Sequence, residues 1–308
     1  MLRRFTLATS TLALAFAAQP AMAEHHAEPA PTGPALWELS DEDTTIYLFG
    51  TVHFLPEGLD WYTPQIEAAL TASDQFVTEI DTSAIPQVAP GETPPPEAMA
   101  LAQMQVQLAQ LTTGGTLREL MADEDRSQYE AAMTDAGIPP EAFDGFEPWF
   151  AFVTLSQLAL VQQGLDPAAG VERSLDRLVE GKDRAAFETV EQQFTMLDSL
   201  PLESQLTLLD GTVENLPEMG SALGAMIDEW IAGDADGLAQ LLNEDMTDPV
   251  VYDALLTARN ANWAQWIDDR MDEPGTVFIA VGAGHLAGAG SVQDQLAERG
   301  FTVERVEP

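Results

Sequence analysis

The sequence predicts an α/β protein in which a mixed β-sheet is formed by the amino- and carboxyl-terminal segments and flanked by helices, with a large helical middle region. Strand-like apolar runs lie near both ends of the chain, whereas residues from about 97 to 271 carry mainly helical periodicity. Of the 308 residues, 45% are hydrophobic and 20% are charged, as in ordinary folded proteins. We therefore expect one sheet completed by segments that are distant in sequence.

The first 23 residues have the composition of a secretory signal peptide. Arg3 and Arg4 supply positive charge, an apolar stretch covers residues 5–18, and Ala21-Met22-Ala23 is a small-residue cleavage site. The apolar stretch is short for a membrane span, and the chain has no cysteine to carry a lipid anchor. We expect secretion, to a bacterial periplasm or the medium, with no membrane anchor after cleavage.

The mature chain is expected to begin with a lead-in and a hairpin. Residues 24–34 are polar and rich in proline, which predicts a flexible lead-in to a single domain over residues 35–308. Two β-prone runs at 35–39 and 45–49 flank the turn-forming residues 40–43. This pattern predicts two antiparallel strands.

The next elements alternate before the helical middle begins. An amphipathic helix is predicted near 63–72, a strand at 75–80 and a proline-rich loop at 85–96. Residues 116–119 fit a capping box that opens another helix, and residues 189–192 fit a second capping box, which follows a short strand at 185–188. Helical periodicity predicts further helices at 97–111, 148–163, 167–180, 201–210, 219–232 and 249–271.

The carboxyl-terminal segment returns to β–α–β order. We predict a strand at 276–281, a helix at 291–299 and a strand at 301–306. These strands would join those of the amino-terminal segment in one sheet.

Charge and composition exclude several classes of function. The chain has 51 acidic and 12 basic residues and a net charge of −39, which repels nucleic acid and anionic lipid headgroups. No nucleic-acid partner is therefore expected. The absence of cysteine excludes disulfides, thiol catalysis and thiolate metal ligands. Imidazole chemistry must use His25, His26, His53 or His285.

Two of the four histidines occur in the same local pattern. Gly50-Thr-Val-His53 and Gly282-Ala-Gly-His285 each follow an apolar, strand-like run. Ligands of α/β sheets bind outside the carboxyl ends of the strands. Gly50, Gly282 and Gly284 suit a backbone that turns sharply or approaches a ligand closely. We predict that His53 and His285 belong to one site, although a role as hydrogen-bonded turn residues stays open.

Three glutamates are candidates for the same site. Glu79 ends the predicted strand at 75–80, Glu172 lies in Gly170-Val-Glu, and Glu188 precedes a predicted helix cap. Each has a simpler interpretation as well. Glu79 could be solvated, Glu172 could pair with neighbouring arginines, and Glu188 could complement a helix amino terminus.

Arg259 and its neighbour Asn260 lie on the predicted helix 249–271. The face that carries Arg259 is otherwise apolar, with Leu255, Trp263 and other large residues at helical spacing. An unpaired buried guanidinium costs several kcal/mol. Its partner must therefore be a carboxylate or an anionic transition state.

These motifs make the sequence similar to the TraB/GumN family, which is related to Tiki-type secreted metalloproteases and more distantly to the erythromycin-esterase/ChaN-like group. The matching pieces extend from about residue 36 to 306: GTVH at 50–53, FVTEID around Glu79, GVE at 170–172, FETVEQQ at 187–193, ARN at 258–260 and VGAGHLAG at 281–288. The resemblance implies an α/β fold with a helical middle. It also implies a site of two histidines and several acidic residues, with metal-dependent peptidase activity in the Tiki branch.

The expected cofactor is a divalent metal ion. Imidazoles combined with carboxylates suit Zn²⁺, Mn²⁺ or Co²⁺, and we predict His53, His285, Glu79 and Glu172 as the ligands. No His-Glu-x-x-His helix occurs, so the protein is not a zincin.

The expected reaction is metal-dependent hydrolysis, of a peptide bond or in a small molecule. The predicted catalytic residues are Glu79, Glu188, Arg259 and Asn260: a glutamate would move the proton, and Arg259 or Asn260 would stabilise an oxyanion. Two alternatives stay open. One is a metal-free, esterase-like hydrolase with a histidine as general base, and the other is a non-catalytic protein that binds haem or another small ligand.

The charge yields the first testable prediction. Loss of Arg3 and Arg4 with the signal peptide would change the net charge from −39 to −41, and self-repulsion of this size destabilises the folded state. We expect the melting temperature to rise clearly between about 0.01 and 1 M NaCl, because the Debye length falls from about 30 to 3 Å. A flat or falling curve, measured by circular dichroism, would contradict this prediction.

Overall fold

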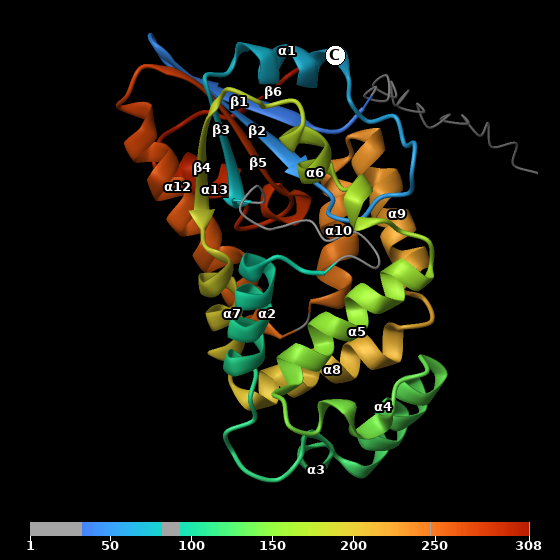
Figure 1. Ribbon diagram of the computed structural model, residues 1–308. Helices are drawn as coiled ribbons and strands as arrows, with labels where there is room; N and C mark the ends of the chain where they lie inside the picture. The colour runs from blue at the N-terminus through green and yellow to red at the C-terminus, as the bar shows by residue number, and fades with distance from the viewer. Residues whose placement is uncertain (1–32, 82–92, 247, 308) are drawn as a thin grey trace, which may run out of the picture. The chain divides into compact units, whose positions relative to one another are not determined.

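The computed structural model of the chain describes residues 33–81, 93–246 and 248–307 (Figure 1). Contacts between Cα atoms divide the chain into residues 1–30 and 31–308, and every described residue lies in the second unit. The predicted signal peptide, nearly all of the predicted lead-in and most of the predicted proline-rich loop lie outside the described residues.

Within the described residues, six strands form one mixed sheet in the order β4-β3-β5-β2-β1-β6. The strands from β4 to β2 run parallel, whereas β1 is antiparallel to both β2 and β6. The bounds are β1 (Leu36–Ser40), β2 (Thr44–Thr51), β3 (Gln75–Ile80), β4 (Asp183–Glu188), β5 (Gly275–Gly282) and β6 (Glu304–Arg305). The predicted fold class is confirmed, and the sheet also takes β4 from the middle of the chain.

The strand register aligns the ends of the parallel strands. β2 pairs with β5 from Thr44 opposite Gly275 to Thr51 opposite Gly282, so both strands end at the same level. β3 lies between β5 and β4, and Ile80 pairs with Glu188. The residues that follow these strands therefore emerge along one edge of the sheet.

Helices cover the sheet and form the middle of the chain (Figure 1). The α-helices are α1 (Pro64–Ala72), α2 (Pro96–Leu108), α3 (Leu117–Leu120), α4 (Asp123–Asp135), α5 (Pro148–Gln162), α6 (Val171–Asp176), α7 (Val190–Asp198), α8 (Leu202–Asn215), α9 (Met219–Ala232), α10 (Ala235–Asp245), α11 (Pro249–Tyr252), α12 (Ala258–Met271) and α13 (Val292–Glu298). Short helical turns are η2 (Pro140–Phe143), η3 (Pro167–Ala169), η4 (Asp253–Thr257) and η5 (Ala283–Leu286).

Both predicted capping boxes are present. The Thr116 hydroxyl accepts from the Glu119 N–H, and the Glu119 carboxylate accepts from the Thr116 N–H. Thr189 and Gln192 make the equivalent pair at the start of α7. Each box satisfies two N–H groups that have no partner inside the helix. The second box fixes where β4 ends and α7 begins.

Several predicted elements differ from the structure. The predicted helix 167–180 is replaced by η3, a turn at Gly170, and the short α6. A Cβ on Gly170 would lie 2.3 Å from the His53 carbonyl oxygen, so this close approach interrupts the helix. The predicted strand 301–306 forms sheet pairs only at β6, and the predicted helix 249–271 contains the π-helical turn η4 between α11 and α12.

Two helices, α4 and α10, were not predicted from the sequence. Helix α4 buries Tyr129 and Met133 but otherwise carries mostly polar residues, so its apolar periodicity is weak. Three acidic residues in its first turn complement the helix dipole. Packing against α8 stabilises this helix more than its own pattern does.

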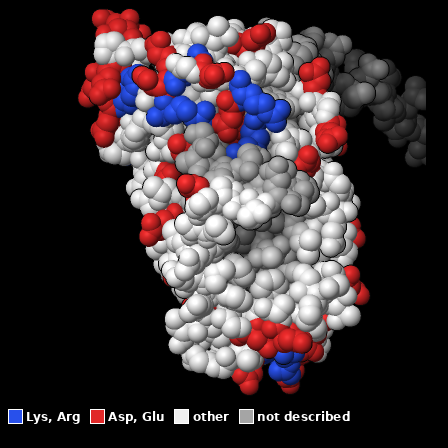
Figure 2. Space-filling model, in the orientation of Figure 1, with Lys and Arg blue, Asp and Glu red and all other residues white. Residues whose placement is uncertain are grey.

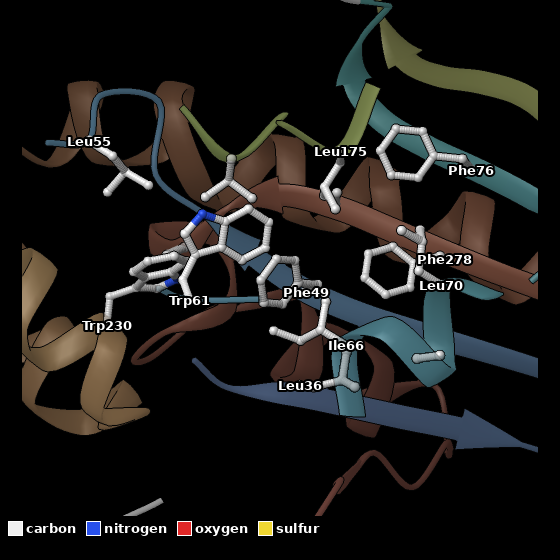
Figure 3. Packing of buried hydrophobic residues seen from close by; sticks show 14 of the residues in the cluster. Leu36, Phe49, Leu55, Trp61, Ile66, Leu70, Phe76, Leu175, Trp230 and Phe278 are labelled. Carbon is white, nitrogen blue, oxygen red and sulfur yellow. The ribbon is translucent and has the colours of Figure 1, made fainter. Parts of the chain in front are cut away.

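One face of the sheet packs against α1, α6, α9 and α10. The core on this face is aromatic, and Figure 3 shows Trp61 and Trp230 beside Phe49. The Phe49 ring lies 5.9 Å from that of Trp61 and 6.4 Å from that of Trp230. The indole N–H of Trp230 also donates to the Gly50 carbonyl at 2.8 Å. Helix α9 is thereby attached to the end of β2.

The opposite face packs against α12 and α13. Leu48, Val77 and Ile279 point to this side and meet Trp263 and Ile267 of α12. Alternating strand residues are therefore buried on both faces, as expected for parallel strands between two helical layers. None of the helices in the described ranges has the length and apolar content needed to cross a membrane.

Candidate functional site

The structure brings all the predicted polar site residues to the carboxyl edge of the parallel strands. His53 follows β2, Glu79 lies near the end of β3, Glu188 ends β4, and His285 lies in η5 directly after β5. Helices supply the other members: Glu172 from α6, and Arg259 and Asn260 from α12. We call this group the His–Glu–Arg cluster.

His53 is paired with Glu172. Its Nδ1 lies 2.7 Å from Glu172 Oε1, and the same oxygen accepts a hydrogen bond from the Thr51 hydroxyl. The attraction of the Glu172 carboxylate raises the pKa of His53 to about 9. Glu172 is buried, yet its partners His53 and Thr51 lower its pKa against the effect of burial.

His53 is also where the cluster opens to solvent. Its side chain is 60% exposed, whereas the side chains of Glu172 and Glu79 are only 11% and 12% exposed. Because Nδ1 is held by Glu172, Nε2 is the ring nitrogen of His53 that has no hydrogen-bond partner among the described residues. A small molecule from solvent can therefore reach the cluster at His53.

His285 is buried and held by Asn260. Its Nδ1 lies 2.6 Å from Asn260 Oδ1, and the Asn260 amide in turn donates to the Gly290 carbonyl at 2.8 Å. Arg259 Nη1 lies 3.1 Å from Nε2 and can only donate. The hydrogen-bond network thus assigns the proton of a neutral ring to Nδ1. Burial lowers the pKa of His285 to about 4, so the ring is neutral at pH 7.

Arg259 joins two glutamates. Its Nε and Nη2 donate to the two oxygens of Glu188 at 2.8 and 2.9 Å, and Nη2 also donates to Glu79 Oε2 at 2.8 Å. The side chains of Arg259, Glu79 and Glu188 are 13%, 12% and 16% exposed. Of the two kinds of partner expected for Arg259, a carboxylate or an anionic transition state, the structure shows two carboxylates, Glu79 and Glu188.

The contacts of the three glutamates go beyond their simpler interpretations. Glu79 is not solvated but accepts from the Gly282 N–H at 2.7 Å and from Arg259. Glu188 pairs with Arg259, and Glu172 pairs with His53 and not with a neighbouring arginine. Burial opposes the ionisation of Glu79. The charge of His285 in its protonated form, the charges of His53 and Arg259, and the Gly282 N–H together outweigh burial and lower the pKa of Glu79.

Two residues of the cluster were not predicted. Gln193 of α7 donates to Glu79 at 3.3 Å and to Glu188 at 3.2 Å. The indole N–H of Trp263 donates to Glu188 at 3.1 Å, and the Arg259 guanidinium lies 4.8 Å above the Trp263 ring. Gln193 lies inside the FETVEQQ motif, and Trp263 follows Arg259 by one helical turn. These sequence positions are the features from which Gln193 and Trp263 could have been assigned to the cluster.

The motif glycines, which have no Cβ, let neighbouring atoms approach the backbone closely. A Cβ on Gly50 would lie 3.1 Å from the Ala283 Cα, so Gly50 allows η5 to cross β2. A Cβ on Gly282 would lie 2.9 Å from Glu79 Oε1 and 3.9 Å from His53 Nε2, so Gly282 leaves space inside the cluster. Gly284 faces Leu242 of α10 and not the cluster.

The donor atoms of the cluster suit a divalent cation. His53 Nε2, His285 Nε2 and the Glu79 carboxylate are ligands that Zn²⁺, Mn²⁺ and Co²⁺ accept. His285 Nε2 and Glu79 Oε1 lie 3.6 Å apart. The described residues contain no group of three His, Asp or Glu side chains already arranged as a metal site, and Arg259 engages His285 Nε2. The guanidinium must release this nitrogen before a cation can bind it.

The net charge of the cluster also favours the binding of a divalent cation. Three carboxylates face one guanidinium, and His285 is neutral at pH 7, so the cluster is negatively charged whether or not His53 carries a proton. Glu172 and Asn260 hold the Nδ1 atoms, as outer partners of metal-bound imidazoles do. Glu172 therefore fits an orienting role better than its predicted role as a ligand.

Fold and site together define an α/β protein with a His–Glu–Arg cluster at the carboxyl edge of its parallel strands, exposed at His53 and otherwise largely buried. The chain belongs to the TraB/PrgY/gumN family, whose model matches residues 35–305. The resemblance inferred from the motifs is thus confirmed.

Curated relatives cover most of the chain. It is 24% identical over 272 residues to the uncharacterised protein YbaP of Escherichia coli (strain K12), which covers 86% of this chain and 92% of that protein. It is also 24% identical over 257 residues to the uncharacterised protein YbaP of Shigella flexneri, with coverage of 81% and 87%. No solved structure matches the chain at a significant level.

The His53–Glu172 pair yields a test by titration. In protein treated with a chelator, we expect the His53 ring to titrate near pH 9, and Glu172→Gln to shift its pKa toward the ordinary value of about 6.5. Because the pKa is raised on folding, the stabilisation is fully present below pH 6.5 and is lost as pH rises through 9. Imidazole NMR spectra would follow the ring, with the exposed Glu203→Gln as control. An unchanged His53 titration in Glu172→Gln would exclude the pairing.

Proposed function

We propose that this protein is a secreted, metal-dependent hydrolase, and specifically a peptidase, that acts at the His–Glu–Arg cluster. One observation carries the proposal. Each imidazole is held at Nδ1 by an acceptor of its own, Glu172 or Asn260, and this turns both Nε2 atoms toward Glu79, where His285 Nε2 is engaged by Arg259. Paired imidazoles oriented in this way are characteristic of catalytic metal sites.

His53, His285 and Glu79 would hold the cation. Such an ion supplies Lewis-acid chemistry, because it polarises a carbonyl and makes water more acidic. Three protein ligands leave room for substrate, as catalytic sites require. The open side at His53 is the direction from which a peptide would approach.

The chain's own groups would complete the reaction. Arg259 Nη1 donates to the Leu255 carbonyl and lies against His285 Nε2, and because the guanidinium is rigid it would shift as a unit to direct the second N–H of Nη1 to an oxyanion. Glu188 accepts hydrogen bonds from Arg259 and from the Trp263 N–H, and these bonds would fix its position for accepting a proton from water. Asn260 would act through His285, whose ring it orients.

A metal-free hydrolase is the second candidate, because the His53–Glu172 pair is the arrangement of a base and its orienting carboxylate. The raised pKa separates the two candidates. With a pKa of about 9, His53 is mostly protonated at pH 7 and becomes a competent base only in alkaline solution. A metal-free enzyme would therefore gain activity toward pH 9 and would resist chelators.

Metal content and peptidase activity test the proposal on the purified protein. We expect a bound divalent ion by elemental analysis, and peptide cleavage that a chelator abolishes and Mn²⁺, Co²⁺ or Zn²⁺ restores. His53→Ala and His285→Ala should each weaken metal binding at least about tenfold, and the double variant should add little, because ligands of one ion act as a unit. Glu79→Gln should have an intermediate effect.

Glu203→Gln, an exposed change on α8 with the same loss of charge as Glu79→Gln, is the control and should retain the metal. Melting temperatures of all variants separate loss of metal from loss of fold. Full metal occupancy in either histidine variant, or additive effects of the two, would contradict a shared site. Cleavage that persists in chelator and rises toward pH 9 would favour the metal-free candidate.

A further inference from the structure

A groove of about 370 Å³ lies beside the His–Glu–Arg cluster and outside it. One wall is the loop that follows His53, with Glu57, Leu59 and Trp61, and the other wall comes from η3 and α6, with Asp166, Ser174 and Arg177. Neither the ion pair of Arg259 nor the histidines line it. The groove is large enough for one or two amino-acid residues of a peptide.

Two backbone hydrogen bonds connect the walls of the groove with the segment around exposed His53. The Val171 N–H donates to the Val52 carbonyl at 3.1 Å, and the Asp166 N–H donates to the Leu55 carbonyl at 3.1 Å. Helix α6 carries Glu172 toward His53, while Ser174 and Arg177 of the same segment line the groove. A peptide bound in this groove would thus lie next to exposed His53.

Arg177 is the cationic side chain of the groove. Its Nη2 donates to the Ala168 carbonyl at 3.3 Å, and among the described residues no carboxylate lies within ion-pair distance of it. Ser174 lies three residues before Arg177, on the same side of this segment. Arg177 is exposed and makes no ion pair with a described residue, so its guanidinium is available to an anionic ligand in the groove.

The surroundings of Arg177 are also unusually basic for this protein. Residues 173–184 contain four basic and three acidic side chains, against a net charge of −39 for the whole chain. Figure 2 shows Lys and Arg side chains gathered on the face where α6 lies. This stretch has a net charge of +1, so it repels anions less than the strongly acidic remainder of the chain does.

Two acidic residues limit the kind of anion. Glu57 and Asp166 also line the groove, and Asp166 is engaged with the Ala168 N–H at 2.8 Å. A dianion such as phosphate would face these carboxylates at greater cost than a carboxylate with a single charge. Leu59 and Trp61 offer apolar contact to the rest of a ligand.

We propose that this groove is a substrate subsite that binds a carboxylate group of a peptide, with Arg177 as its charged partner and Ser174 as a second donor. The inference rests on the proposed peptidase function and names its substrate class. The carboxylate can belong to the peptide's carboxyl terminus or to an acidic side chain, and the experiment below distinguishes the two.

Binding is measured by calorimetry on chelator-treated full-length protein, so that no cleavage occurs. The probes are N-acetyl-trialanine with a free carboxylate, the same peptide as an amide, N-acetyl-Ala-Glu-Ala-amide, and inorganic phosphate. The variants are Arg177→Gln, Ser174→Ala and the control Arg126→Gln, an arginine of α4 with the same change of charge. We expect Arg177→Gln to weaken binding of the free-carboxylate peptide by about tenfold or more, as for loss of a charged hydrogen bond.

The other arms complete the test. The amide should bind weakly and without dependence on Arg177, and Ser174→Ala should have a smaller effect. Tighter, Arg177-dependent binding of the glutamate-containing amide than of the free-carboxylate peptide would assign the carboxylate to a side chain. The proposal is overturned if no peptide carboxylate binds, if phosphate binds more tightly, or if Arg126→Gln weakens binding as much as Arg177→Gln. Because binding is measured without metal or turnover, failure of the peptidase proposal would appear separately.

Discussion

The pairing of Arg259 with Glu79 and Glu188 is the interaction on which the site depends. Two carboxylates at the ends of neighbouring parallel strands are brought together with little access to water, and their mutual repulsion would be costly without a cation between them. Arg259 supplies that charge and hydrogen bonds to both. The same guanidinium reaches His285, so it also connects the glutamates to the histidine half of the cluster.

The sheet makes this pairing possible because its parallel strands end together. β2 and β5 are in register to their last residues, which sets His53 and His285 on adjacent turns. Helix α12 then places Arg259 over the carboxyl edge of the sheet. This helix follows η4, and π-helical turns of this kind frequently occur at functional positions. Aromatic contacts hold this arrangement, since the Trp263 ring lies 4.2 Å from that of His285 and 4.9 Å from that of Phe187.

Much of the fold and the membership of the cluster could be predicted from the sequence, because strand periodicity and a repeated G-x-x-H motif are local signals. The capping box at Thr189 even located the end of β4. What could not be predicted depends on contacts between distant segments. The orientation of Glu172 toward His53, the part played by Gln193, and helix α4 with its weak apolar pattern all follow from tertiary packing. The groove at Arg177 likewise requires loops that meet only in the folded chain.

The most direct measurement of the central interaction is a double-mutant cycle on the free energy of unfolding at pH 7. Arg259→Met should cost about 3–5 kcal/mol, because it removes the guanidinium that pairs two largely buried carboxylates. Adding Glu188→Gln to Arg259→Met should recover part of this loss, giving a coupling of about 0.5–3 kcal/mol. Simple addition of the two single effects, or a cost of Arg259→Met below about 1 kcal/mol as for an exposed ion pair, would contradict the role assigned to Arg259.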